Sequence, residues 1–275
     1  MTSERIPAGR QDLFGRHPVG AYFSLTFGVS WLAALAVASP DLVRGEPISK
    51  LTGILMFPAM LLGPSLSGVV MTRIADGKTG LRELFSRMFR ARPPARWYAA
   101  LAIPPILVKA VLLFLTTFVS PAYTPNRFFV GILFGIPAGF LEEIGWTGYA
   151  YPRMCSRMNG LSAGVLLGLL WSLWHAPVID HLGTAVPHGV YWLPFFLAFA
   201  LAMTAMRVLI SWVYVNTRSV LLAQLMHTVS TGSLVIFSPS AATAAQEVMW
   251  YAVYGLVLWL AVAIVVRAFG QRLRH

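Results

Sequence analysis

Residues 140–149, which read FLEEIGWTGY, decide the fold of this chain because they place two adjacent carboxylates inside an apolar run. The run is long enough to cross a membrane as a helix. The other acidic residues fall at the ends of apolar segments or in polar loops. An ionised group at the middle of a bilayer costs roughly 2.5–3.5 kcal/mol, which makes Glu142 and Glu143 candidate functional residues. The alternative is a structural ion pair between helices.

The composition is that of a membrane protein. The 275 residues are 57% hydrophobic and only 11% charged, whereas a soluble domain carries about 25% charged residues. Apolar runs of about 20 residues recur along the chain, and segments of about ten alternating residues, as in a membrane β-barrel, do not. The sequence therefore predicts an all-α, polytopic membrane helical bundle. The single cysteine, Cys155, excludes an internal disulfide and a thiolate metal cluster.

We expect about eight transmembrane helices in one domain, residues 20–268, between an N-terminal tail, 1–19, and a C-terminal tail, 269–275. The predicted spans are about 20–39, 51–72, 97–118, 128–150, 161–178, 190–214, 219–237 and 248–267. Between the second and third spans, apolar residues recur at helical spacing opposite arginines. This pattern predicts a basic amphipathic helix at about 79–91 that lies in the headgroup region.

The basic residues indicate an orientation rather than a nucleic-acid partner. With both termini inside, sixteen lysines and arginines fall in inner segments and three, Arg44, Lys50 and Arg127, in outer loops. This bias predicts that both termini are cytoplasmic. The net charge of +11 is spread over short loops, so no nucleic-acid surface is expected. Arginine outnumbers lysine 18 to 3, which is typical of a GC-rich bacterial genome and favours a bacterial cytoplasmic membrane.

Two histidines also lie inside predicted spans, His175 in the fifth and His227 in the seventh. Glu142 and His175 are nearly equally far, in residues, from a predicted turn at Asn159-Gly160. If both helices run regularly, the two groups lie at the same depth, about 25 Å from the turn. A lone histidine in a membrane is more often an interhelical hydrogen-bonding residue, but two histidines beside two carboxylates favour a reactive site.

Glu142 and Glu143 cannot face the same cavity, because adjacent helical residues point about 100° apart. Gly131, Gly135 and Gly139 recur every fourth residue, and Glu143 continues that stripe. Glycine stripes are typical of close helix contacts. We therefore expect Glu143 to be structural and Glu142 to face a cavity.

The order of these motifs resembles the CPBP family of intramembrane proteases, which includes type II CAAX prenyl endopeptidases and bacteriocin-processing or self-immunity proteins. The family pattern is Glu-Glu-x-x-x-Arg, then aromatic-x-x-x-His, then His-x-x-x-Asn. Its matches are Glu142-Glu143, Trp171 to His175, and His227 to Thr231. Two positions depart from the usual pattern, because Thr147 replaces the arginine and Thr231 replaces the asparagine.

The resemblance implies an intramembrane endopeptidase that acts on a membrane-associated protein or peptide. Glu142 would activate water, His175 would orient it, and His227 with Thr231 would stabilise the oxyanion. Glu143, Thr147 and Trp171 would support the site. We expect no cofactor, although Glu142, His175 and His227 are an acceptable zinc set. The substitutions at Thr147 and Thr231 leave open a catalytically inactive immunity or assembly factor, and a proton-coupled transporter is a third alternative without an inverted repeat to support it.

Thr147 cannot neutralise Glu143, so a buried Glu143 needs another partner. Intramembrane charges are usually paired, and the predicted spans contain two further cations, Lys109 and Arg207. Because a guanidinium suits a carboxylate better than an ammonium does, we expect Arg207 to reach Glu143, with Lys109 as the second choice. The alternative for both side chains is to extend towards the lipid headgroups.

Overall fold

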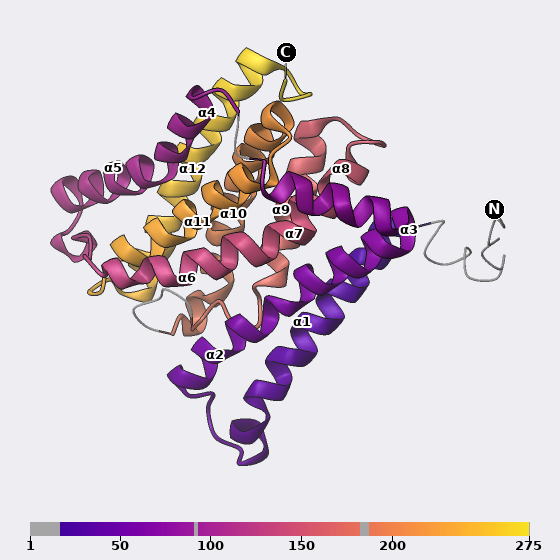
Figure 1. Cartoon of the computed structure of the whole chain (residues 1–275). Helices are drawn as coiled ribbons and strands as arrows, with labels where there is room; N and C mark the ends of the chain where they lie inside the picture. Colours follow the sequence, from indigo (N-terminus) through magenta and orange to yellow (C-terminus); the bar gives the residue numbers. More distant parts are fainter. Residues whose placement is uncertain (1–16, 91–92, 182–186, 275) are drawn as a thin grey trace, which may run out of the picture.

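The computed structural model describes residues 17–90, 93–181 and 187–274, and this part of the chain contains only helices, turns and loops. Figure 1 shows helices packed side by side as a bundle. Their bounds are α1 Pro18–Val43, α2 Lys50–Met60, α3 Leu62–Met88, α4 Arg96–Ala99, α5 Ile103–Phe118, α6 Ile132–Pro137, α7 Glu143–Gly145, α8 Tyr151–Met154, α9 Gly160–Trp174, α10 Trp192–Thr217, α11 Val220–Phe237 and α12 Ala244–Phe269. The predicted N-terminal tail lies mostly outside the described residues.

Seven helical segments in the described residues are long and apolar enough to cross a membrane. They are Pro18–Val43, Lys50–Met88, Arg96–Phe118, Phe129–Met154, Gly189–Thr217, Val220–Phe237 and Ala244–Phe269. The expected span 161–178 is a shorter apolar helix, α9, which ends at Trp174. The expected end at 178 is wrong because Pro177 disfavours helical geometry at the residue before it.

Apolar side chains face outward from the bundle, as expected for a protein surrounded by lipid. Examples on the outer faces of six helices are Leu32, Leu66, Ile106, Leu113, Leu133, Leu197, Leu260 and Ile264. The interior holds carboxylates, histidines and an arginine that are buried. These features confirm the predicted all-α polytopic membrane bundle.

Helices α1 to α3 form one flank of the bundle, and α5 packs against α12 on the other (Figure 1). On α1, the buried residues recur every fourth position from Tyr22 to Ala38 and include small polar side chains. Ser30 donates a hydrogen bond to the carbonyl of Met60 at 2.7 Å. A side chain at Gly63 would collide with Ser30, so the close approach of α1 and α3 depends on small residues.

The glycine stripe of the fourth span makes the close helix contact that the sequence predicted, and the helix it packs against is α11. A Cβ atom at Gly135 or Gly139 would collide with Thr228, and one at Gly131 would lie 2.7 Å from Val235. Without these glycines the helices could not approach so closely. The contact matters for the site because it holds Glu143 directly against α11.

The predicted amphipathic helix is the second half of α3. The chain breaks helical geometry at Gly77, whose φ is 68°, a region that favours glycine. Beyond this break, Leu84 is fully buried and Arg87 donates to the hydroxyl of Tyr214 at 2.7 Å and to the carbonyl of Gly148 at 3.2 Å. The helix is therefore docked on the bundle by one apolar and one basic side chain. It ends at Met88, before the Pro93-Pro94 pair that follows.

Candidate active site

The fourth span is not a regular helix at the two glutamates. Two π-helical turns, Ala138–Glu142 and Trp146–Ala150, lie on either side of the single α-helical turn of α7. Pro137 directly precedes the first, and its missing N–H leaves the carbonyl four residues earlier without its usual partner. Isolated π turns occur frequently at functional sites. The assumption of a regular helix here was wrong.

The wide turn leaves backbone carbonyls that neighbouring helices satisfy. Gln224 of α11 donates to the carbonyl of Phe140 at 2.9 Å, and Ser65 of α3 donates to that of Leu141 at 3.0 Å. Buried backbone groups need such partners because an unpaired one costs about as much as a lost hydrogen bond. Side chains from two helices thus fix the backbone immediately before Glu142.

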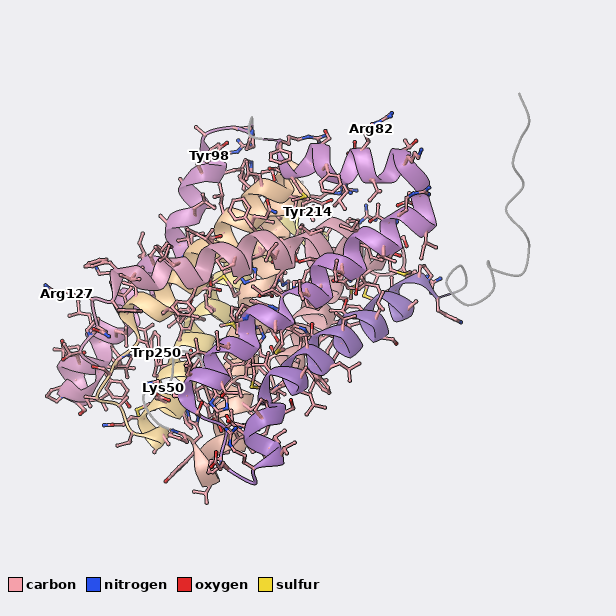
Figure 2. All side chains as sticks on the ribbon, turned by 60° about the horizontal axis from the view of Figure 1, so that its bottom comes forward. Lys50, Arg82, Tyr98, Arg127, Tyr214 and Trp250 are labelled. Carbon is pink, nitrogen blue, oxygen red and sulfur yellow. The ribbon has the colours of Figure 1, made fainter. Side chains whose placement is uncertain are left out.

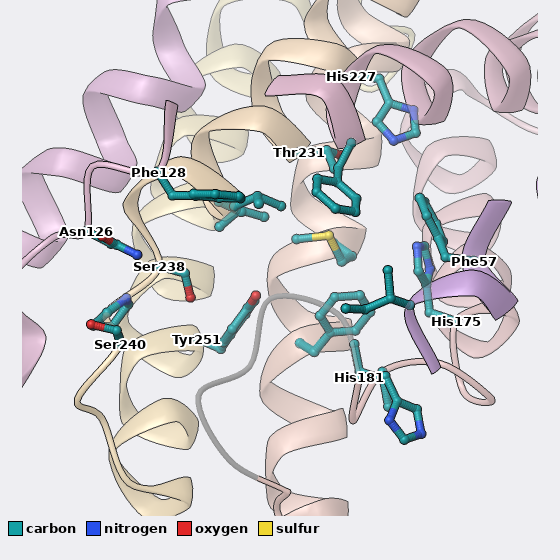
Figure 3. A pocket seen from close by; sticks show the side chains of 18 of the residues that line it. Phe57, Asn126, Phe128, His175, His181, His227, Thr231, Ser238, Ser240 and Tyr251 are labelled. Carbon is teal, nitrogen blue, oxygen red and sulfur yellow. The ribbon is translucent and has the colours of Figure 1, made fainter. Parts of the chain in front are cut away.

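A cavity of about 380 Å³ opens beside this turn. Glu142, Trp171, His175, His227 and Thr231 all line it, so five of the residues singled out in the sequence meet in one pocket. Figure 3 shows His227 and Thr231 at one end of the pocket and Ser240 at the other. The walls between are mostly apolar and include Ile54, Phe57, Phe134, Phe199, Met203 and Leu234.

Glu142 is fully buried, and its two oxygens have different surroundings. Oε2 accepts hydrogen bonds from the indole N–H of Trp171 at 2.7 Å and of Trp146 at 3.0 Å. Oε1 is buried without a hydrogen-bond partner in the described part of the chain. Since buried polar atoms are nearly always paired, Oε1 is suited to a water or substrate atom in the pocket.

His175 caps the C-terminus of α9 and is held by the backbone of its own helix. Its Nδ1 lies 2.8 Å from the carbonyl oxygen of Trp171. Because a carbonyl can only accept, Nδ1 carries the proton and Nε2 is left as an acceptor. Phe57 stacks on the ring with centroids 6.4 Å apart, which restricts the ring further.

Glu143 is also fully buried, but both of its oxygens have partners. Oε1 lies 2.8 Å from Nη1 of Arg207 and 2.7 Å from Nδ1 of His227. Oε2 accepts from the hydroxyl of Thr147 and from Nη1 of Arg207, the latter at 2.9 Å. The predicted contact between Arg207 and Glu143 is confirmed, and Thr147 is a hydroxyl donor in place of the arginine of the family pattern.

The arginine binds Glu143 through one nitrogen rather than through a two-pronged fork. Its Nε and Nη2 have no hydrogen-bond partner among the described residues, and the guanidinium carbon lies 4.3 Å from the centre of the Trp171 ring. Stacking on an aromatic face is a recognised way to accommodate a guanidinium. Lys109, the second choice, is exposed and lies 5.6 Å from the Phe237 ring. It does not reach Glu143.

His227 is tied to Glu143, which the sequence interpretation did not foresee. The carboxylate accepts from Nδ1, so the other ring nitrogen, Nε2, is the one available to the pocket that His227 lines. Trp146 was also missed. It lies four residues after Glu142, and this spacing on a helix is the sequence signal that could have identified it.

The zinc alternative does not fit the side chains as they stand. Within residues 17–90, 93–181 and 187–274, no group of three or more His, Cys, Asp or Glu side chains could hold a metal ion. Oε2 of Glu142 is already engaged by two indole donors. The chemistry proposed below therefore uses only protein side chains and water.

Comparison with known proteins covers this part of the chain. Residues 124–233 match the family model described as type II CAAX prenyl endopeptidase Rce1-like. The chain is also 32% identical over 114 residues to CAAX prenyl protease 2 of Methanococcus maripaludis. That alignment covers 39% of this chain and 41% of the archaeal protein, so it spans less than half of the relative's length.

The matched segment contains all four predicted catalytic residues, Glu142, His175, His227 and Thr231, and also Glu143 and Arg207. Motif order, buried geometry and the family model agree on the same helices. Through this segment, the chain resembles the Rce1-like family of type II CAAX prenyl endopeptidases.

Proposed function

We propose that this protein is an intramembrane endopeptidase that hydrolyses a peptide bond of a membrane-associated protein or peptide by means of a glutamate-activated water. The observation that carries the proposal is the unpartnered Oε1 of Glu142 in a pocket that two histidines also line. The names of the family and of the archaeal relative support protease chemistry. The proposed setting is a bacterial cytoplasmic membrane with both termini cytoplasmic.

The nucleophile is a water bound at Oε1 of Glu142. Trp146 and Trp171 donate to Oε2 and hold the carboxylate in place, so Oε1 can accept a proton from this water. The acceptor Nε2 of His175 orients the water through its second hydrogen. The hydroxide oxygen then bonds to the carbonyl carbon of the scissile peptide.

The tetrahedral intermediate carries an oxyanion that needs donors. The hydroxyl of Thr231 is one, and Nε2–H of His227 is the other when the ring carries both protons and Nδ1–H donates to Glu143. Residues four apart share a helix face, so both groups of α11 can reach one atom. Collapse of the intermediate breaks the C–N bond, and the proton held by Glu142 passes to the leaving amine.

The position of Arg207 bears on the alternative that this chain is a catalytically inactive immunity or assembly factor. That alternative was motivated by the two threonines in place of the arginine and the asparagine. The buried ion pair shows that the charge at Glu143 is neutralised from α10 instead of from its own helix. The Thr147 substitution is therefore compensated in space, which favours the active enzyme.

The test compares Glu142→Gln with the parent protein on a reporter peptide embedded in detergent micelles or liposomes. Glutamine keeps the size of the side chain and can still accept from an indole, but it cannot take the proton from water. We expect hydrolysis to be lost while the thermal midpoint is retained. Full turnover by Glu142→Gln would refute the catalytic assignment.

Glu83→Gln is the matched control, because Glu83 is a 56% exposed carboxylate on α3 outside the pocket. It should leave turnover unchanged. A chelator should also leave turnover unchanged. Loss of activity with chelator and its return with zinc would favour the metal alternative instead.

A further inference from the structure

The pocket has a closed end and an open end along the helix axes. Glu142 and His227 are at the inner end, whereas Lys50, Asn126 and Ser240, which also line the pocket, lie at helix ends and in loops. Asn126 and Ser240 are exposed. Figure 3 shows Asn126 and Ser240 far along the pocket from His227. The open end is therefore formed by the loops before α2, before α6 and after α11.

Aromatic side chains close the pocket beyond Glu142. Trp146 and Tyr149, one and two turns further along the same span, are fully buried. Tyr22 of α1 packs on both, with ring centroids 5.7 and 5.2 Å away, and Trp174 packs on Trp146 at 6.0 Å. These packed rings block the closed end, and the open end is therefore the route to Glu142 that the pocket itself offers.

The loops at the two ends of the helices differ strongly in charge. The loops at the open end contain three basic residues, Arg44, Lys50 and Arg127. The helix ends and loops at the opposite end contain nine among the described residues: Arg73, Lys78, Arg82, Arg87, Arg90, Arg96, Arg153, Arg157 and Arg218. Figure 2 shows Arg82 well away from Lys50 and Arg127. Short loops rich in lysine and arginine stay on the cytoplasmic side.

We infer that the pocket opens on the side of the membrane that faces away from the cytoplasm, and that its substrate is a polypeptide segment that enters from that side. The mostly apolar walls, which include Phe199, Met203 and Leu234, fit a segment with apolar side chains. The inference rests on the proposed function for the reaction, but the side of entry can be tested without turnover.

The experiment labels single cysteines with a membrane-impermeant maleimide in intact cells. In a Cys155→Ala background, Ser240→Cys places a thiol at the pocket mouth and Ser156→Cys places one at the opposite end. Both serines are exposed, so the two substitutions are matched. We expect Ser240→Cys to be labelled in intact cells and Ser156→Cys to be labelled only after permeabilisation. The reverse pattern, or labelling of both in intact cells, would overturn the inference.

Leu234→Cys tests whether the pocket itself is accessible from that side, because Leu234 lines the pocket wall. Its labelling in intact cells would show that the pocket itself is open to that side. Protection of Leu234→Cys in cells in which Ser240→Cys is labelled would overturn an open route from that side. If labelling follows our expectation but no peptide is hydrolysed, the proposed reaction fails and the side of entry stands.

Discussion

Glu142 and Glu143 are neighbours in the sequence, are both fully buried, and are surrounded in opposite ways. Glu143 faces α10 and α11, from which Arg207 and His227 contact it, and Thr147 of its own span is the third partner of its two oxygens. Glu142 faces the pocket with one oxygen held by two indoles and the other without a partner in the described residues. On one side of this helix the carboxylate is therefore fully paired, and on the other side one carboxylate oxygen borders the pocket.

The difference teaches how one helical turn can serve two purposes. A buried carboxylate that is fully paired is a weak proton acceptor, because the neighbouring cation and hydrogen-bond donors stabilise its ionised form. A carboxylate with one free oxygen remains available to water. His227 contacts Glu143 and also lines the pocket. The carboxylate of Glu143 therefore fixes the position of a side chain that borders the same pocket as Glu142.

The largest effect is expected from the two histidines that line the pocket. His175→Ala and His227→Ala should each lower the rate of peptide hydrolysis by about 10²–10⁴-fold, the usual contribution of a positioned acid–base group. Initial rates with purified protein measure this. His17→Ala, which changes an exposed histidine at the start of α1, is the control and should keep the parental rate. A parental rate in either pocket variant would contradict the proposed roles.

Much of this site could be predicted from spacing alone. The four-residue stripe from Gly131 to Glu143 correctly indicated which glutamate lies in the close helix contact, because helix periodicity is a local property. The choice of Arg207 as the partner of Glu143 followed from counting the cations inside apolar spans, since a buried charge needs an opposite one.

Arg207→Ala removes the arginine that pairs with Glu143. It leaves Glu143 buried without its cation, so we expect a loss of about 3–5 kcal/mol in the free energy of unfolding. The thermal midpoint in detergent measures this loss. Lys109→Ala removes the other intramembrane cation, which is exposed, and should change the midpoint little.

The double variant Arg207→Ala/Thr147→Arg tests whether the charge at Glu143 can come from its own helix. Position 147 already contacts Glu143, so an arginine there should recover part of the lost stability. Equal midpoints for Arg207→Ala and Lys109→Ala would contradict the importance of the ion pair. A double variant less stable than Arg207→Ala would show that the space beside Glu143 cannot accept a guanidinium.

The π turns and the roles of the tryptophans could not be predicted in the same way. A π turn depends on which distant side chains satisfy the carbonyls of Phe140 and Leu141, and Gln224 and Ser65 come from separate helices. Hydrogen bonds from Trp146 and Trp171 to one oxygen also require three-dimensional placement. Sequence periodicity indicates neither which distant side chains satisfy a backbone carbonyl nor which indoles reach the same carboxylate oxygen.

Trp146→Phe tests the surroundings of Glu142, and we expect a smaller effect than from the histidine or arginine substitutions. It removes one hydrogen bond to a charged group, worth about 1.5–3 kcal/mol, and retains a ring in a fully buried position. If that energy holds Glu142 in its reactive position, kcat falls by about 10- to 100-fold. KM should stay constant, because Trp146 lies behind Glu142. Trp250→Phe, at a buried tryptophan away from the pocket, controls for loss of indole volume. A changed KM with constant kcat would contradict this role.

A third buried histidine, His188, extends the comparison. It lies between two carboxylates, as Arg207 lies beside Glu143, but unlike an arginine it can lose its charge near neutral pH. His188 lies 2.6 Å from Oδ1 of Asp180 through Nδ1 and 2.8 Å from Oε2 of Glu247 through Nε2. Its ring stacks on Phe195 with centroids 3.6 Å apart. Burial acts to lower the pKa of His188, but the hydrogen bonds and charges of Glu247 and Asp180 outweigh it and raise the pKa above its ordinary value of 6.5.

The smallest effect is therefore expected in the pH dependence of stability. Because the folded-state pKa of His188 is raised, the stabilisation by its protonated form is complete below pH 6.5 and is lost as the pH rises through the raised pKa. Thermal midpoints measured across this range should fall with rising pH in the parent protein. His188→Gln cannot titrate, so its midpoint should lack this component of the decline, while Glu142→Gln should keep it. An identical pH slope in the parent and His188→Gln would show that this cluster, unlike the Glu143 pair, contributes no net charge interaction to the fold.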